Sequence, residues 1–148
     1  MKGNIETDTV RYVQSNLVTR LLAFDANLEG NGFGFGDGKA GNYYVDGWKS
    51  KDQKISWTFR MLKPAAFKVV IKYVATPESE GSYQMDIGSN SFREKVVPSL
   101  KGNTIVTKEL GTISLATMDK IIISPVEIIK PELMKLLEVQ LIPVDIKK

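Results

Sequence analysis

The 148-residue chain is long enough for one domain, and 43% of its residues are hydrophobic and 9% aromatic. It contains no cysteine and no histidine, which excludes thiol nucleophiles, Ser-His-Asp triads and zinc sites built on these residues. The net charge of +3 is scattered along the chain without a run of like charge. This distribution indicates solvated faces and argues against nucleic-acid binding.

No stretch of about 18 consecutive apolar residues occurs, so we expect no membrane insertion. The first thirty or so residues lack the basic start, apolar run and small-residue cleavage site of a secretion signal. By this criterion the protein is either cytoplasmic or exported with its signal removed as part of a longer chain.

The N-terminal part of the chain predicts short strands. We expect residues 1–20 to form an extension or an edge strand, and residues 21–148 to form the main domain. Apolar and polar residues alternate over residues 9–13, and a second apolar run covers residues 21–24. A helix over residues 8–24 is the alternative, but β-branched residues and an intervening polar break favour strands.

Residues 30–41, GNGFGFGDGKAG, are half glycine and are expected to form a long loop, because glycine loses the most backbone entropy inside a helix or strand. Gly36, Gly38 and Gly41 match the letters of a dinucleotide-binding motif. That motif needs a helix after the glycines, whereas residues 42–45 have an extended pattern, so we expect no nucleotide site.

Two alternating segments lie at the centre of the chain, within residues 55–73, ISWTFRMLKPAAFKVVIKY. A period of two predicts strands with one buried face. Pro64 cannot donate a ladder hydrogen bond and therefore fits the connection between them. We expect a hairpin at the centre of the core, with Trp57 buried in it.

Further strands are predicted at residues 83–87, 92–97, 105–110, 113–115, 120–125 and 136–142. Turn signals recur about every 8–12 residues, the spacing typical of an antiparallel two-sheet β-sandwich. Pro131 fits the first position of one helical turn over residues 131–134. The predicted fold class is all-β.

Oxygen-bearing side chains indicate a candidate calcium site. Asp25, Asn27 and Gly30 imitate the start of an EF-hand loop, but Gly36 stands where that loop needs a bidentate glutamate. Ligands at alternate positions of an edge strand point the same way, so Asp25 and Asn27 could be joined by Glu138 on the last strand. The alternative is that Asp25 and Asn27 are exposed edge-strand or turn residues.

Aromatic rings beside the glycine-rich loop are candidate sugar-binding groups. Tyr43, Tyr44 and Trp48 follow the loop, next to Asn42. Flat rings and amides suit the apolar C–H face and the hydroxyl groups of a sugar. If residues 42–48 form a strand, Tyr44 and Trp48 share one face and Tyr43 lies on the other, so at least one set is expected in the core.

Paired carboxylates are the remaining route to catalysis. Asp46 with Asp52, or Glu78 with Glu80, would be the candidates, because glycosidases use two carboxylates about 5–10 Å apart. Isolated carboxylates on turns are more simply explained as solvated or salt-bridged surface groups. We therefore expect no enzyme activity.

A series of segments is shared in order with a known group of proteins: residues 22–30, 52–59, 67–73, 81–83, 110–115 and 133–143. The series resembles the non-catalytic β-sandwich module appended to bacterial family-29 α-L-fucosidases and some sulfatases. It is also similar to the galactose-binding-like carbohydrate-binding modules of families 6 and 35.

This resemblance implies a galactose-binding-like jelly roll, often holding a structural calcium, in an exported polysaccharide-degrading system. In calcium-bearing relatives two acids on the first strand and one on the last hold the ion. Asp25, Asn27 and Glu138 fall on these positions, and Asn27 departs from the pattern by removing a charge. The relatives' sugar-binding loop residues are matched most nearly by Asn42, Tyr44 and Trp48.

The sequence thus predicts a non-catalytic carbohydrate-binding or accessory module of a glycan-degrading system. Its predicted partners are an oligosaccharide and a glycoside hydrolase catalytic domain, near which it would keep the glycan. The alternative is a structural packing module that supports a glycoside hydrolase without a ligand of its own. The resemblance predicts a periplasmic, cell-surface or secreted protein, and a cytoplasmic location stays open. The predicted sugar contacts are Asn42, Tyr43, Tyr44 and Trp48.

Overall fold

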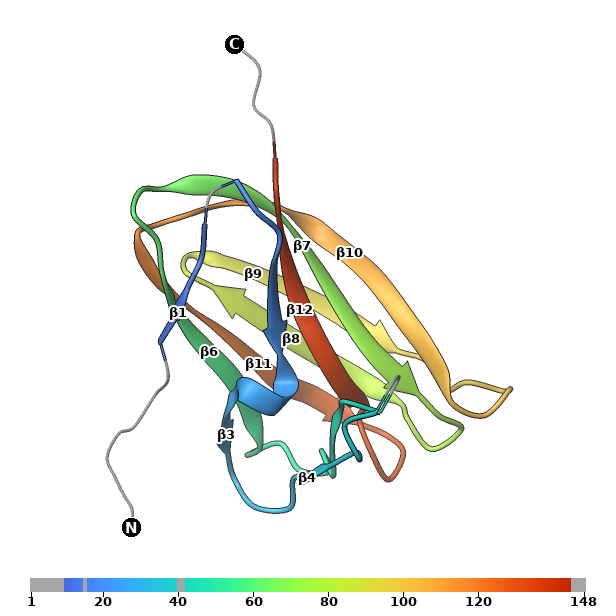
Figure 1. The fold of residues 1–148 in the computed structure, drawn as a ribbon. Coiled ribbons are helices and arrows are strands. Elements are labelled where there is room, and N and C mark those ends of the chain that lie inside the picture. The colour runs from blue at the N-terminus through green and yellow to red at the C-terminus, as the bar shows by residue number, and fades with distance from the viewer. Residues whose placement is uncertain (1–9, 15, 40–41, 145–148) are drawn as a thin grey trace.

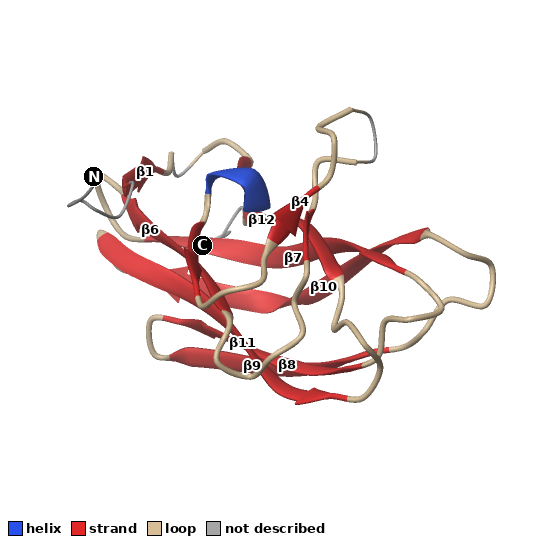
Figure 2. Cartoon of the chain, turned by 90° about the horizontal axis from the view of Figure 1, so that it is seen from below, coloured by secondary structure: helices blue, strands red, loops and turns tan. Residues whose placement is uncertain are grey.

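The computed structural model describes residues 10–14, 16–39 and 42–144. This part of the chain consists of strands and one short 3-10 helix, η1 (Ala23–Asp25). The strands form two sheets packed face to face, as Figures 1 and 2 show. The predicted all-β, two-sheet sandwich is confirmed. Within the described ranges no helix is long and apolar enough to cross a membrane.

Sheet A has six strands in the order β1-β6-β11-β8-β9, with β3 also paired to β6. The pairing of β1 with β6 is parallel and the other strand pairings are antiparallel. The strands of sheet A are β1 (Val10–Tyr12), β3 (Asn27–Glu29), β6 (Lys54–Arg60), β8 (Gly81–Ile87), β9 (Asn90–Val96) and β11 (Met118–Ile128).

Sheet B also has six strands, in the order β10-β7-β12-β5-β4, with β2 also paired to β12. All of these pairings are antiparallel. The strands of sheet B are β2 (Thr19–Leu22), β4 (Gly34–Phe35), β5 (Val45–Asp46), β7 (Ala65–Ala75), β10 (Thr104–Leu115) and β12 (Lys135–Pro143).

The predicted central hairpin is wrong in its pairing, although both of its strands exist. β6 pairs with β11 in sheet A, whereas β7 pairs with β10 and β12 in sheet B. The connection that contains Pro64 therefore crosses from one sheet to the other. Both strands bury alternate residues in the same core. A period of two indicates which face of a strand is buried, but it does not indicate which strand is its hydrogen-bonded neighbour.

Smaller expectations have mixed outcomes. The described residues between 10 and 22 form strands β1 and β2, which confirms the favoured strands over the alternative helix. The boundary predicted at residue 20 falls inside β2. Residues 1–9 lie outside the described residues. Residues 104–115 form one strand with a bulge where two were predicted. No helical turn follows Pro131, because Glu132 forms a parallel bridge with Ser79 instead.

The core lies between the sheets and contains large aromatic side chains. Trp48, Trp57, Tyr83, Phe59 and Phe67 are fully buried, and each such ring removes on the order of 150–250 Å² from water. Burial of Trp57 was predicted and is confirmed. With the core filled by these rings, the polar side chains that a ligand can reach lie on the surface, and the loops at the two ends of the sandwich carry some of them.

Candidate functional site

The end of the sandwich nearest the glycine-rich loop contains a polar hollow, which we call the loop-end pocket. Its volume is about 480 Å³. Three segments meet there: the chain around β4 and β5, the turn that follows β7, and the connection from β11 to β12, all toward the lower side of Figure 1. The lining residues are Gly32, Asp46, Gly47, Lys49, Thr76, Glu78, Pro131, Glu132 and Lys135.

Gln53 holds the bend that forms one wall of this pocket. Its buried side chain accepts hydrogen bonds at Oε1 from the amides of Lys49 (2.6 Å) and Ser50 (2.8 Å), and Nε2 donates to the carbonyl of Gly47 (2.9 Å). Gly47 has a φ of 77°, and a side chain there would meet the carbonyl oxygen of Gly32. The bend therefore needs glycine at this position.

Two carboxylates share one ammonium group in the pocket wall. The Nζ atom of Lys135 lies 3.0 Å from Oε1 of Glu132 and 3.9 Å from Oδ2 of Asp46. Oε2 of Glu132 also accepts a hydrogen bond from the amide of Gly47 at 2.7 Å. The side chain of Glu132 is 10% exposed and that of Asp46 is 31% exposed. Asp46 therefore keeps an accessible acceptor surface, while Glu132 mainly positions its neighbours.

Of the carboxylate pairs considered from the sequence, Asp46 with Asp52 does not form. Asp46 is joined to Glu132 through Lys135, whereas Asp52 accepts a hydrogen bond from the hydroxyl of Ser50. The shared ammonium group neutralises part of the negative charge in the wall. The arrangement can bind hydroxyl groups, since it offers both acceptors and donors at fixed positions.

Trp48 belongs to the core and not to a sugar-binding surface. Its ring is fully buried, and Nε1 donates to the carbonyl of Gln53 at 2.9 Å. A ring without an exposed face cannot stack on a sugar, so this part of the prediction is wrong. The reason is local: β5 ends at Asp46, and the chain then bends at Gly47, which turns the tryptophan inward.

The other predicted sugar contacts, Asn42, Tyr43 and Tyr44, directly follow the glycine-rich loop. Asn42 is exposed. The hydroxyl of Tyr43 donates to Oε1 of Glu138 at 2.7 Å, which ties this ring to β12. The ring of Tyr44 is half-buried, and Nζ of Lys135 lies 5.3 Å from its centroid, a cation–π contact. Through Lys135, Tyr44 therefore supports the loop-end pocket.

Glu138 is fully buried and its carboxylate is bound by protein donors. Arg20 donates from Nε to Oε2 (2.8 Å) and from Nη2 to Oε1 (2.6 Å), Tyr43 donates through its hydroxyl, and Gln140 donates from Nε2 (2.8 Å). Burial alone would raise the pKa of Glu138, but these hydrogen bonds outweigh it and lower the pKa to about 2. Burial and the bond to Glu138 raise the pKa of Tyr43.

The predicted calcium ligands do not fit a calcium ion in this arrangement. Asn27 lies in β3 of sheet A and Glu138 in β12 of sheet B, and both carboxylate oxygens of Glu138 are bound by Arg20. Across the described residues, no three Asp, Glu, His or Cys side chains gather closely enough to hold a metal. Calcium takes about 6–8 oxygen ligands, whereas the guanidinium of Arg20 is the cation beside Glu138. Asp25 is exposed at the end of η1.

Two exposed rings that were not predicted as ligand contacts lie at the glycine-rich loop, Phe35 within it and Phe24 beside Phe35. Phe24 is 38% exposed and Phe35 is 57% exposed, and their rings meet edge to face with centroids 5.6 Å apart. Phe35 lies in β4, which pairs with β5, the strand that carries Asp46. These rings are therefore better placed for stacking on a ligand than the buried Trp48.

The pocket residues Glu132 and Lys135, and Gln53 that holds the bend beside the pocket, were not predicted from the sequence. Glu132 had one usable signal: a carboxylate directly between Pro131 and the apolar residues Leu133 and Met134, where burial requires a partner. Gln53 and Lys135 carry no comparable signal, because their roles depend on contacts made only in the folded chain.

No protein-family model and no curated protein sequence matches this chain. Solved structures do share its fold. The carbohydrate-binding module CBM36 in complex with calcium and xylotriose has a TM-score of 0.60 and 13% identity, over 82% of this chain and 97% of that chain. The GH26-CBM35 β-(1,4)-mannanase of Podospora anserina has a TM-score of 0.66 and 16% identity, over 88% of this chain and 28% of that chain.

A protein of a different kind shares the fold equally well. The mosquito-larvicidal Cry4Aa toxin of Bacillus thuringiensis has a TM-score of 0.71 and 13% identity, over 94% of this chain and 25% of that chain. The chain thus spans about a quarter of the length of the mannanase and the toxin. At these identities the likeness establishes the fold, a β-sandwich of the kind found in carbohydrate-binding modules. The resemblance to the fucosidase-appended module stays a prediction.

Proposed function

We propose that this chain is a non-catalytic carbohydrate-binding module and that the loop-end pocket binds the oligosaccharide. The observation that supports this most strongly is the cluster of Asp46, Glu132 and Lys135 in the wall of an open pocket of about 480 Å³. A sugar presents hydroxyl groups around a ring, and carboxylate acceptors and ammonium donors at fixed positions are suited to bind them.

The cluster is held in place before a ligand arrives. Lys135 is fixed by Glu132 on one side and by the ring of Tyr44 on the other, and Glu132 is fixed by the amide of Gly47. Binding then orders few additional side chains, which lowers its entropic cost. In this proposal Asp46 accepts a hydrogen bond from a sugar hydroxyl.

The likeness to CBM36, which was solved with xylotriose, supports a neutral oligosaccharide as the ligand class. The name of the mannanase that shares the fold, GH26-CBM35, combines a catalytic family with a binding-module family. By analogy, the present chain would raise the effective concentration of glycan near a glycoside hydrolase partner. Such a role belongs to an exported protein, and export is part of the proposal.

The test is a binding screen by isothermal titration calorimetry with xylotriose, mannotriose and galactotriose. We expect at least one neutral probe to bind, and Asp46→Ala combined with Lys49→Ala to weaken it by about tenfold or more, the loss expected for two hydrogen bonds to charged groups. Lys101→Ala removes an exposed lysine on the β9–β10 connection and should leave affinity unchanged.

Three results would contradict the proposal. One is the absence of binding in a wider glycan array. Another is unchanged affinity in the double variant, with an unchanged melting temperature that shows the variant is folded. The third is release of shorter sugars from the bound probe, measured by chromatography, because this would show catalysis.

A further inference from the structure

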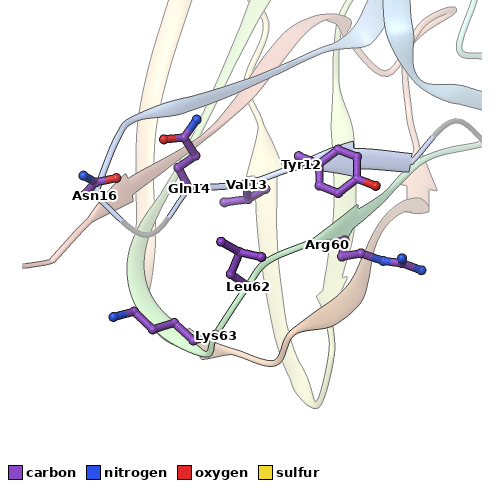
Figure 3. Close-up of a pocket in the computed structure, with 7 residues that line it drawn as sticks. All are labelled: Tyr12, Val13, Gln14, Asn16, Arg60, Leu62 and Lys63. Carbon is purple, nitrogen blue, oxygen red and sulfur yellow. The ribbon is translucent and has the colours of Figure 1, made fainter.

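A second hollow lies at the opposite end of the sandwich, where the chain leaves β6 and crosses to β7, and we call it the turn-end pocket. Its volume is about 360 Å³, within the range of about 300–1,000 Å³ that ligand pockets occupy. Figure 3 shows its lining: Tyr12, Val13, Gln14, Asn16, Arg60, Leu62 and Lys63.

The parallel pairing of β1 with β6 fixes the aromatic end of this pocket. Tyr12 and Arg60 are cross-strand partners, and the amide of Val13 donates to the carbonyl of Arg60 at 2.9 Å. Cross-strand partners project to the same face of a sheet, so the ring and the guanidinium lie side by side. The ring of Tyr12 is 74% exposed and has a free face.

The pocket has an apolar centre between two polar ends. In Figure 3, Val13 and Leu62 lie in the middle, with Tyr12 and Arg60 on one side. The amides of Gln14 and Asn16 and the ammonium group of Lys63 lie on the other side. The apolar centre accepts the C–H groups of a sugar, and each end offers hydrogen-bond donors.

The lining carries two cations and no carboxylate, in contrast to the loop-end pocket. None of the ion pairs among the described residues involves Arg60 or Lys63. The guanidinium of Arg60 lies 3.7 Å from the sulfur of Met118. The neighbouring acid Asp119 instead accepts from the amide of Lys120 at 3.0 Å. Both cations are therefore available to an anion.

We propose that the turn-end pocket binds an oligosaccharide that carries carboxylate or sulfate groups. One sugar ring stacks on Tyr12 while its anionic group accepts two hydrogen bonds from Arg60, a geometry that a guanidinium provides. The amides of Gln14 and Asn16 bind hydroxyl groups of a following sugar, and Lys63 pairs with its anionic group. This site goes beyond the neutral-glycan site proposed above and does not depend on it.

The experiment uses the full chain with three probes: trigalacturonate for carboxylates, a heparin-derived tetrasaccharide for sulfates, and neutral xylotriose. Calorimetry at low salt should show binding of an anionic probe. Comparing the affinities of the carboxylated and sulfated probes then shows which anionic group is preferred. Arg60→Gln combined with Lys63→Gln should lower that affinity about tenfold or more, and Tyr12→Ala about fivefold. Raising salt from about 50 to about 200 mM should weaken binding, because exposed charges are screened.

Two controls separate a built site from general attraction to charge. Lys51→Gln combined with Lys101→Gln removes the same charge from exposed lysines elsewhere and should leave binding unchanged. Asp46→Ala with Lys49→Ala in the loop-end pocket should also leave it unchanged, which keeps the two proposals distinguishable.

The proposal is overturned if neither anionic probe binds, or if both pairs of charge-removing variants weaken binding equally. If the variant with Arg60 replaced does not fold, Tyr12→Ala provides the test, because this exposed ring contributes little to the core. Unchanged affinity of Tyr12→Ala for the anionic probe would then overturn the proposal.

Discussion

Glu132 and Glu138 are two buried carboxylates on or beside β12 that have different surroundings. The oxygens of Glu138 are bound by Arg20, Tyr43 and Gln140 inside the structure. Glu132 has two donors, one of which, Lys135, also faces an open pocket. A carboxylate bound entirely by protein donors therefore stabilises the fold, whereas one that shares its cation with a pocket can position that cation for a ligand.

The largest expected effect comes from removing the bound carboxylate. Glu138→Ala leaves three donors without their acceptor and should lower the free energy of unfolding by about 2–3 kcal/mol. Breaking a buried ion pair costs about 3–5 kcal/mol, but Arg20 is 55% exposed and water can solvate it. Urea denaturation measures the change, with Glu109→Ala on the exposed edge of β10 as a control expected to stay within about 0.5 kcal/mol. A loss below about 1 kcal/mol for Glu138→Ala would contradict this account.

The same carboxylate predicts a specific loss of stability in acid. The pKa of Glu138 in the folded chain is about 2, below its ordinary value of 4.5. A lowered folded-state pKa contributes stability that is present above the unfolded pKa and is lost as the pH falls through the folded one. The free-energy difference between wild type and Glu138→Gln, on the order of 2–3 kcal/mol at neutral pH, should shrink between about pH 5 and about pH 2. Parallel pH profiles for the two proteins would be the contrary outcome.

Replacing Glu132 is expected to have a smaller effect on stability than replacing Glu138, and a larger effect on binding. Glu132→Gln keeps an acceptor for the amide of Gly47 but loses the charge that fixes Lys135. We expect a loss of about 1 kcal/mol or less in urea denaturation. Affinity for the neutral oligosaccharide should fall about three- to tenfold. If Glu132→Gln destabilised the chain as much as Glu138→Ala, the distinction between the two carboxylates would fail.

The smallest effect on stability is expected at Tyr83, a buried residue whose hydroxyl has no hydrogen-bond partner among the described residues. The hydroxyl of Tyr83 makes no hydrogen bond within the described structure, and burial raises the pKa of this phenol. Because an unsatisfied hydroxyl costs free energy in the core, Tyr83→Phe should be neutral or stabilising by up to about 1 kcal/mol. Thermal denaturation with both proteins at one concentration measures this, and a clear destabilisation would show that the hydroxyl has a partner.

The strands were predictable because alternation reports burial directly. β6 and β7 were located within a residue or two, and Trp57 was placed in the core correctly. The pairing of these two strands was not predictable, since facing strands in two sheets and neighbouring strands in one sheet both produce a period of two.

The candidate site was less predictable than the fold, because its contacts join distant residues. An acid at position 138 was visible, but its cation, Arg20, lies 118 positions away in the sequence, and no local pattern links them. Trp48 shows the same limit: beside a glycine-rich loop it has the features of a ligand-binding ring, and only the bend at Gly47 turns it into the core.

Amide chemical-shift mapping of the nitrogen-15-labelled chain, titrated with a neutral trisaccharide such as xylotriose, tests most directly whether the loop-end pocket binds a glycan. We predict that the largest shifts occur at Gly32, Gly47 and Lys49, which line the loop-end pocket. Two results would contradict binding at the loop-end pocket. One is the absence of amide shifts with every glycan tested at high concentration, and the other is shifts confined to the β6–β7 end of the sandwich.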